Sequence, residues 1–299
     1  MLPPNGVGPK GVAAPNSSKV RVIIVGLGIA GLTAAIECHR KGHSVIAFDR
    51  LDVLQRYGDV IGIGANGGMV IGQWGNEVRD ALREWIHVTP QLDIYDGNGK
   101  SIGQHTYSAT HEEKYMLRRS MLADIMYRQA QSLGIDMRLG VKVSDFWEDD
   151  HEAGVIVNGE KIGADCVIGA DAHVTPPTSG QGGGQAIEDA AVLSICLELA
   201  GRENVPLALR ATETIRKPRA TYVQKNGFSA QMAMFGDDWK KEGKDDNELP
   251  SGSMDAWIWE HDCQSHAYSE YAKVVKALKE NSVYTPTNLA ESVIGTVSS

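Results

Sequence analysis

Three glycines with the spacing Gly26-x-Gly28-x-x-Gly31 directly follow an apolar, β-branched run at residues 20–25. After a strand, the first glycine makes a tight turn, the second leaves room for a pyrophosphate, and the third lets a helix pack closely on the strand. The helix start then offers unpaired N–H groups and a positive dipole end to phosphates. Asp49 ends a second apolar run, about 20 residues further on, where an acid binds ribose hydroxyls. The pattern therefore predicts a dinucleotide site rather than a glycine turn that only packs a helix.

Three further stretches combine residue types that bind phosphate or carbonyl groups. Gly62 lies in a glycine-rich loop at 57–68, which is too long for a simple turn and lets a ligand come close to the backbone. Gly182 and Gly183 precede an apolar helical stretch and predict a second nest of N–H groups at a helix start. Arg119 follows another arginine, and its planar fork suits phosphate or carboxylate. A solvent-exposed basic pair explains the two arginines equally well.

Apolar strands alternate with amphipathic helices along the chain, which predicts an α/β fold with a parallel sheet. Ser120 is expected to cap one helix, and Pro218 is expected to kink or end another. Residues 92–95 and 154–157 are expected to enter hairpin turns. Further strands are expected at 20–25, 44–48, 135–139 and 164–169, and helices at 31–41, 70–85, 185–200, 205 to about 222, and 265–280.

The composition excludes several classes of protein. The 299 residues are 42% hydrophobic and 22% charged, which is typical of a globular protein with a substantial core. A net charge of -9 argues against nucleic acid or an anionic membrane as the main partner, and no apolar run reaches the ~20 residues of a membrane span. Residues 1–18 lack the apolar core of a signal peptide and are expected to be a disordered tail, which favours the cytoplasm. The four cysteines have no metal-ligand spacing, so no metal site is predicted.

In this order, the motifs resemble those of the single-component FAD-dependent monooxygenases, the salicylate hydroxylase-like group and its fungal members in particular. The matches include the Arg-x-x-Leu helix start at Arg119, the segment at 177–183 and the basic helix end at 216–219. The resemblance implies a Rossmann-like FAD-binding domain of the glutathione reductase type at 19–200 and a helical C-terminal region at 201–299. It also implies that FAD is bound by Gly26, Gly28, Gly31, Asp49, Gly62, Arg119, Asp171, Gly182 and Gly183.

The chain departs from the family pattern at residue 171. The family has two separate aspartate motifs, and the second aspartate holds the ribityl chain of the flavin. Residues 166–171 begin as the first motif, whereas Ala172-His173 continue as the second. The β-sheet layer that separates the motifs, and that forms the roof of the substrate pocket, is then missing. We infer an internal deletion near 171–172. The ribityl role of Asp171 is open, because the fused motif is one residue shorter than the family spacing.

In this family NAD(P)H reduces FAD, O₂ forms a flavin hydroperoxide, and the hydroperoxide hydroxylates an electron-rich small molecule. The resemblance thus implies a monooxygenase with FAD as cofactor and NAD(P)H as transient reductant, acting on an aromatic or polyketide-like substrate in fungal secondary metabolism. Two alternatives stay open. One is a truncated flavin-binding pseudoenzyme or splice form, and the other is a plain NAD-binding protein, in which Arg119 and the glycines at 180–184 would have no role. No catalytic side chain is assigned, and structural roles suit His105 and His173 better.

Overall fold

A computed structural model describes residues 20–53, 59–85, 91–95, 99–106, 114–170, 180–235 and 256–287. The expected tail at 1–18, the expected join at 171–172 and the histidine at 173 lie outside these ranges. The described residues form a mixed α/β structure with a parallel sheet and a helical C-terminal part, as the alternating pattern predicted.

A four-stranded parallel sheet in the order β11-β1-β2-β7 is the centre of the fold. Strands β11, β1 and β2 carry apolar side chains on both faces, as expected for a parallel sheet between two layers. Val22 and Ile24 of the first strand face one hydrophobic core, whereas Ile23 faces another. The four strands are β1 (Arg21–Val25), β2 (Ser44–Phe48), β7 (Asp136–Arg138) and β11 (Cys166–Gly169).

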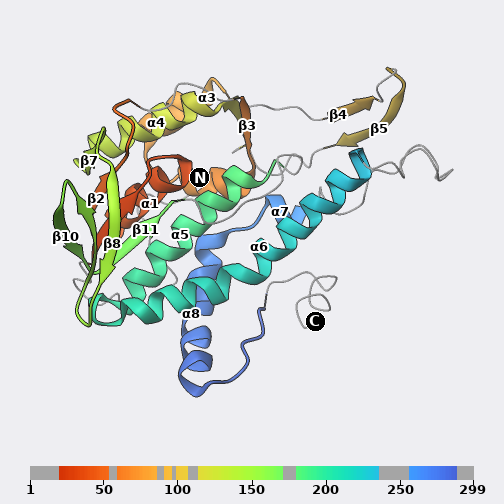
Figure 1. The fold of residues 1–299 in the computed structure, drawn as a ribbon. Helices are drawn as coiled ribbons and strands as arrows, with labels where there is room; N and C mark the ends of the chain where they lie inside the picture. Colours follow the sequence, from red (N-terminus) through yellow and green to blue (C-terminus); the bar gives the residue numbers. More distant parts are fainter. Residues whose placement is uncertain are drawn as a thin grey trace.

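Helices cover one face of this sheet and a second sheet covers the other. Helix α1 (Ile29–Arg40) follows β1 and packs against α5 (Gly182–Ala200), which runs beside it in Figure 1. On the opposite face, Val155 packs in the same cluster as Phe48. The covering antiparallel sheet is made of β8 (Val143–Glu148), β9 (Ala153–Val157) and β10 (Glu160–Ala164).

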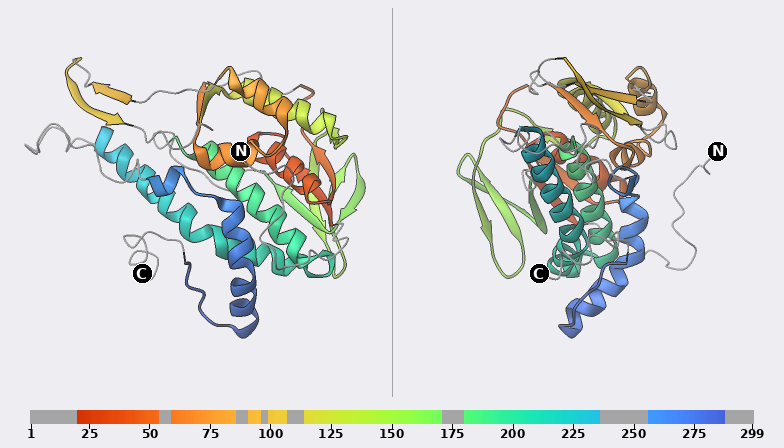
Figure 2. Two further views of the ribbon diagram at one scale, coloured as in Figure 1. Left: turned by 180° about the vertical axis from the view of Figure 1, so that it is seen from behind. Right: turned by 90° about the vertical axis from the view of Figure 1, so that its right-hand side faces the viewer.

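The C-terminal helices pack against α5 on the side away from the sheet. After a short 3-10 turn at Arg202–Asn204, α6 (Val205–Phe235) and α8 (Cys263–Glu280) both contact α5, and the views in Figures 1 and 2 agree on this arrangement. The short helix α7 (Ala256–Trp259) contacts α2 (Ala65–Ile71). Buried residues of α6 and α8 belong to the same hydrophobic cluster as β1 and α1.

The helix expected to end near residue 222 instead continues through Pro218 to Phe235. A proline inside a helix removes one backbone hydrogen bond and usually kinks or ends the helix. Here Arg216 and Arg219, on either side of the proline, are buried and bound to acidic side chains of α5. These tertiary contacts hold α6 together across the proline.

The single helix expected at 70–85 is two helices, α2 and α3 (Asn76–Arg83). Gly75 lies between them with φ +123°, a conformation that ends helical geometry and that side chains rarely adopt. The break turns α3 away, so that only Val78 and Leu82 of α3 are buried.

Ser120 does not cap α4 (Arg119–Ser132), because the helix begins one residue before it and its N-cap residue is Arg118. The preceding strand β6 (Tyr115–Arg118) pairs with β3 (Val60–Ile63) up to the Val60–Arg118 pair. Since this pairing holds Arg118 in extended backbone, the helix starts directly at the strand end.

A hairpin of β4 (Gln91–Tyr95) and β5 (Ser101–Thr106) extends at the end of the molecule far from the parallel sheet (Figures 1 and 2). No helix in the described ranges is long and apolar enough to cross a membrane. All four cysteines are buried and unpaired, and burial raises the thiol pKa of Cys166 and Cys196 to about 12. These two thiols are therefore protonated core residues.

Candidate functional site

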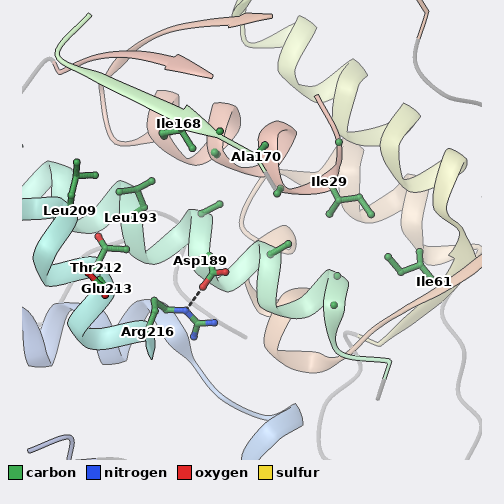
Figure 3. A pocket seen from close by; sticks show the side chains of 18 of the residues that line it. Ile29, Ile61, Ile168, Ala170, Asp189, Leu193, Leu209, Thr212, Glu213 and Arg216 are labelled. Atoms are coloured by element: carbon green, nitrogen blue, oxygen red, sulfur yellow. Dashed lines mark hydrogen bonds and ion pairs between the residues drawn. The ribbon is translucent and has the colours of Figure 1, made fainter. Parts of the chain in front are cut away.

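A cavity of about 610 Å³ opens between the β1–α1 turn, the end of β11, and helices α5 and α6 (Figure 3). At one end it reaches Ile61, and at the other it passes between Ile168 of β11 and Leu193 and Leu209 of the helices. Arg119 also lines it. Its size lies within the usual range of ligand pockets, about 300–1,000 Å³. The wall is mainly apolar, and charged groups come from Arg119, Asp189, Glu213 and Arg216.

The three glycines of the β1–α1 turn have different surroundings. Gly26 has φ +98°, which makes the sharp turn at the end of β1. Gly28 lines the cavity, and a Cβ atom at this position would meet no atom within 4 Å. At Gly31 a Cβ atom would lie 1.9 Å from the carbonyl oxygen of Gly26. The turn therefore needs glycine at 26 and 31 for backbone reasons, whereas at Gly28 the free space lies toward the cavity.

Asp49 lies next to this turn, at the end of β2. Its Oδ2 accepts a hydrogen bond from the backbone N–H of Leu27 at 2.7 Å, and its Oδ1 accepts one from Leu51 at 2.9 Å. The carboxylate thus holds the glycine turn in place. It does not line the cavity, but its side chain is only partly buried, which leaves it accessible to a ligand that extends past the turn.

Arg119 lines the cavity from the first residue of α4. Within the described ranges its guanidinium forms no hydrogen bond or ion pair, although its backbone N–H donates to the carbonyl oxygen of Asp59 at 3.1 Å. The neighbouring Arg118 is exposed and does not line the cavity. The structure therefore separates the two arginines and leaves Arg119 available for an anion.

Gly182 and Gly183 form the first turn of α5 instead of a loop before it, and both line the cavity. A Cβ atom at Gly183 would lie 2.8 Å from Cδ1 of Ile61, so the glycine lets α5 approach β3. The N–H groups of this first turn have no partner within the helix and give its end a positive potential. Gly62 is next to Ile61 in β3, but it does not line the cavity itself.

A buried ionic cluster behind the cavity joins α5 to the C-terminal helices. Glu188 is fully buried and accepts hydrogen bonds from Arg219 at 2.8 Å, from Arg216 and from the Nδ2 atom of Asn66 at 2.6 Å. Burial disfavours its charge, but the two arginines outweigh this effect and hold the pKa of Glu188 well below its ordinary value. The carboxylate is therefore ionised. Arg216 also donates to Asp189 at 2.6 Å.

The sequence predictions did not assign this cluster to the site. Opposite charges did mark it, since Glu188 and Asp189 interrupt an apolar helix and Arg216 and Arg219 flank a proline in the next one. Their pairing was not predictable, because it requires α5 and α6 to pack with these faces together. Asp171, also assigned to the site, lies outside the described ranges.

Known proteins resemble this chain in sequence and in structure. A family profile described as "FAD binding domain" matches residues 21–56. FAD-dependent monooxygenase nodY2 of Hypoxylon pulicicidum is 33% identical over 459 residues, covering 97% of this chain and 99% of the relative. Asperlicin C monooxygenase of Petromyces alliaceus is 32% identical over 435 residues, covering 94% of each chain.

Two solved structures also match. The crystal structure of FqzB superposes with a TM-score of 0.82 at 27% identity, covering 91% of this chain and 98% of that one. The structure of CtdE in complex with FAD and a substrate has a TM-score of 0.78 at 27% identity, covering 87% and 100%.

The parallel sheet, the glycine turn and the cavity beside it define a Rossmann-type dinucleotide-binding protein. The chain belongs to the FAD-dependent monooxygenases, and its cofactor is FAD. The alternative of a plain NAD-binding protein is not supported.

The chain is shorter than these relatives in its interior. The alignment with nodY2 extends over 459 residues and almost the whole of both proteins, whereas this chain has 299 residues. This relative therefore contains an internal stretch that this chain lacks, and its place near the fused aspartate motif stays a prediction.

Proposed function

We propose that the cavity holds FAD, with the pyrophosphate at the β1–α1 turn. The single observation that carries this proposal is a cavity that joins Gly28, Arg119 and the first turn of α5. Gly28 would admit the pyrophosphate, Asp49 would accept from the adenosine ribose, and Arg119 would neutralise phosphate charge. Gly182 and Gly183 would offer N–H groups near Gly62 and the flavin. Asp171, which lies outside the described ranges, stays a predicted cofactor-binding residue whose ribityl role is open.

The reaction that we propose is an NAD(P)H-driven hydroxylation of an aromatic or polyketide-like small molecule by O₂, in secondary metabolism. Bound FAD would supply the chemistry, by taking electrons from NAD(P)H and delivering them to O₂. The chain's own residues would bind and orient the cofactor, and the apolar wall around Ile168 and Leu193 would exclude water. Support comes from relatives named for the small molecules on which they act, such as Notoamide E oxidase notB' of Aspergillus versicolor.

We propose further that residues 19–200 form the FAD-binding domain, that 201–299 form a helical region, and that the internal deletion lies near 171–172. In this arrangement the FAD site is largely complete and the roof of the substrate pocket is reduced. We place the protein in the cytoplasm, with O₂ and a small-molecule substrate as its partners.

The test begins with the visible spectrum of the purified full-length chain. A yellow protein that releases FAD on denaturation is the expected result, and a colourless protein that cannot take up added FAD would contradict the proposed cofactor site. Anaerobic addition of NADPH and then of NADH should bleach the flavin. NADPH consumption is then measured in air with a panel of aromatic substrates. FAD binding without any substrate-dependent oxidation would leave a flavoprotein and disprove the proposed oxygenase activity.

A further inference from the structure

Trp259 of α7 packs on two separate glycines beside the FAD cavity. A Cβ atom at Gly64 would lie 2.3 Å from Cε3 of Trp259, and one at Gly180 would lie 3.6 Å from Cη2 of the same ring. Gly64 connects β3 to α2, whereas Gly180 lies just before α5. The ring therefore fills the space between two segments that are more than 100 residues apart in the sequence.

Both segments continue directly into walls of the cavity. Ile61 lies three residues before Gly64, and Gly182 and Gly183 lie two and three residues after Gly180. The distance between these walls sets the width of the cavity at the end where Ile61 lies (Figure 3). Trp259 itself does not line the cavity.

Arg219 holds the backbone directly before Trp259, whereas the indole N–H of Trp259 makes no hydrogen bond to a described residue. The Nε1 atom is buried and has no hydrogen-bond partner among the described residues, so the ring contributes packing only. The carbonyl oxygens of Trp257 and Ile258 accept hydrogen bonds from Arg219 at 3.2 and 2.6 Å. Arg219 is in turn bound to the buried Glu188.

The same cluster reaches the Gly64 segment by a second route. Asn66 is 1% exposed, and its Nδ2 atom donates to Glu188 at 2.6 Å. Its Oδ1 atom, which has no partner among the described residues, lies 2.6 Å from the Cβ position of Gly64. Glu188 thus connects α2, α5 and, through Arg219, the segment that carries Trp259.

We propose that Trp259 and Arg219 are positioning residues for FAD. This inference rests on the proposed function. Arg219 holds α7, and Trp259 then keeps the Gly64 and Gly180 segments at the separation that the flavin half of the cofactor requires. Trp259 and Arg219 thereby control FAD affinity without lining the cavity. The adenosine half would lie at the β1–α1 turn, which neither Trp259 nor Arg219 contacts. The affinity of the chain for the adenosine half is therefore independent of these two residues.

The experiment compares the affinities of the full-length chain for FAD and for ADP, which occupies only the adenosine end. The Trp259→Leu variant should raise the Kd for FAD roughly 3- to 30-fold and leave the Kd for ADP unchanged. Gly64→Ala, whose Cβ would displace the ring, should give the same split. Trp147→Leu is the matched control, because Trp147 also packs on a glycine, Gly154 of the β8–β10 sheet, but does not line the cavity and should change neither Kd.

Thermal unfolding of each variant separates positioning from general stability. If Trp259→Leu weakens FAD and ADP equally, in step with lost stability, the role is structural and the inference is wrong. Unchanged FAD affinity in both Trp259→Leu and Gly64→Ala would also overturn it. A wild-type chain that binds ADP but not FAD would overturn the proposed function instead.

Discussion

Gly28 and Gly31 lie three residues apart in the same turn, yet an added methyl group would meet different surroundings at each. Gly31→Ala places Cβ 1.9 Å from a backbone oxygen and should lower the free energy of unfolding by at least about 1–3 kcal/mol. Gly28→Ala meets only the cavity and should change the unfolding free energy by no more than about 0.5 kcal/mol, while it weakens FAD binding. Chemical denaturation and FAD titration check both. A Gly28→Ala chain with normal FAD affinity would argue against the pyrophosphate position.

Arg119 and Arg118 provide a second comparison between neighbouring residues. Arg119→Ala removes a cation that lines the cavity and should weaken FAD binding by about 1–2 kcal/mol, near the lower end of the range for charged hydrogen bonds because the side chain is exposed. The loss should shrink at high salt, where the phosphate charge is screened. Arg118→Ala, which changes an exposed residue outside the cavity, should bind FAD normally. Equal losses of FAD affinity in Arg119→Ala and Arg118→Ala would mean that FAD binding depends only on the net charge of the protein.

At the scale of elements, the junction of α5, α6 and α7 contains a histidine whose charge the fold opposes. Burial, together with the positive charge of Arg219, lowers the pKa of His261 to about 3. An unfolded histidine titrates near pH 6.5, so between these values the unfolded chain binds a proton that the folded chain does not. Stability is therefore complete above about pH 6.5 and falls as the pH decreases, by roughly 1.4 kcal/mol per pH unit for this histidine.

The measurement is the free energy of unfolding from pH 7 to pH 5, a window above the titration of Glu188. The pKa of the neighbouring His266 is also lowered, chiefly by burial, and adds a slope of the same sign. His261→Gln should remove the His261 part of the slope and leave that of His266. A slope that does not change in the variant would show that His261 is protonated without cost in the folded protein.

Short-range patterns predicted β1, β2 and the β9–β10 hairpin well, because each is set by local alternation and turn residues. The errors at Pro218 and at 70–85 have opposite physical causes. At Pro218 buried ion pairs on both sides outweighed a local helix breaker. At 70–85 α2 ends at Ile71, and Gly75, with a positive φ, starts α3 as a separate helix although the apolar spacing favoured a single one.

At the scale of the whole molecule, one hydrophobic cluster extends from Val22 in β1 to Val274 in α8. Because the C-terminal helices share this core with the parallel sheet, we expect the described parts of the chain to unfold as one cooperative unit. Tryptophan fluorescence and far-UV circular dichroism should give coincident denaturation curves. FAD at 100 times its Kd should stabilise the folded chain by about 2.7 kcal/mol. Two separated transitions would show that residues 201–299 fold independently.

The sequence by itself determined the α/β class, the glycine turn with its acid at Asp49, and the family to which the chain belongs. These features depend on residues close together in the chain, where spacing and residue type are sufficient. Only the tertiary structure decided which of two adjacent arginines faces the cavity, how Glu188 pairs with Arg216 and Arg219, and that Trp259 packs on Gly64 and Gly180. Each of these depends on the packing of elements far apart in sequence, because a side chain's partners are set by which helix faces meet.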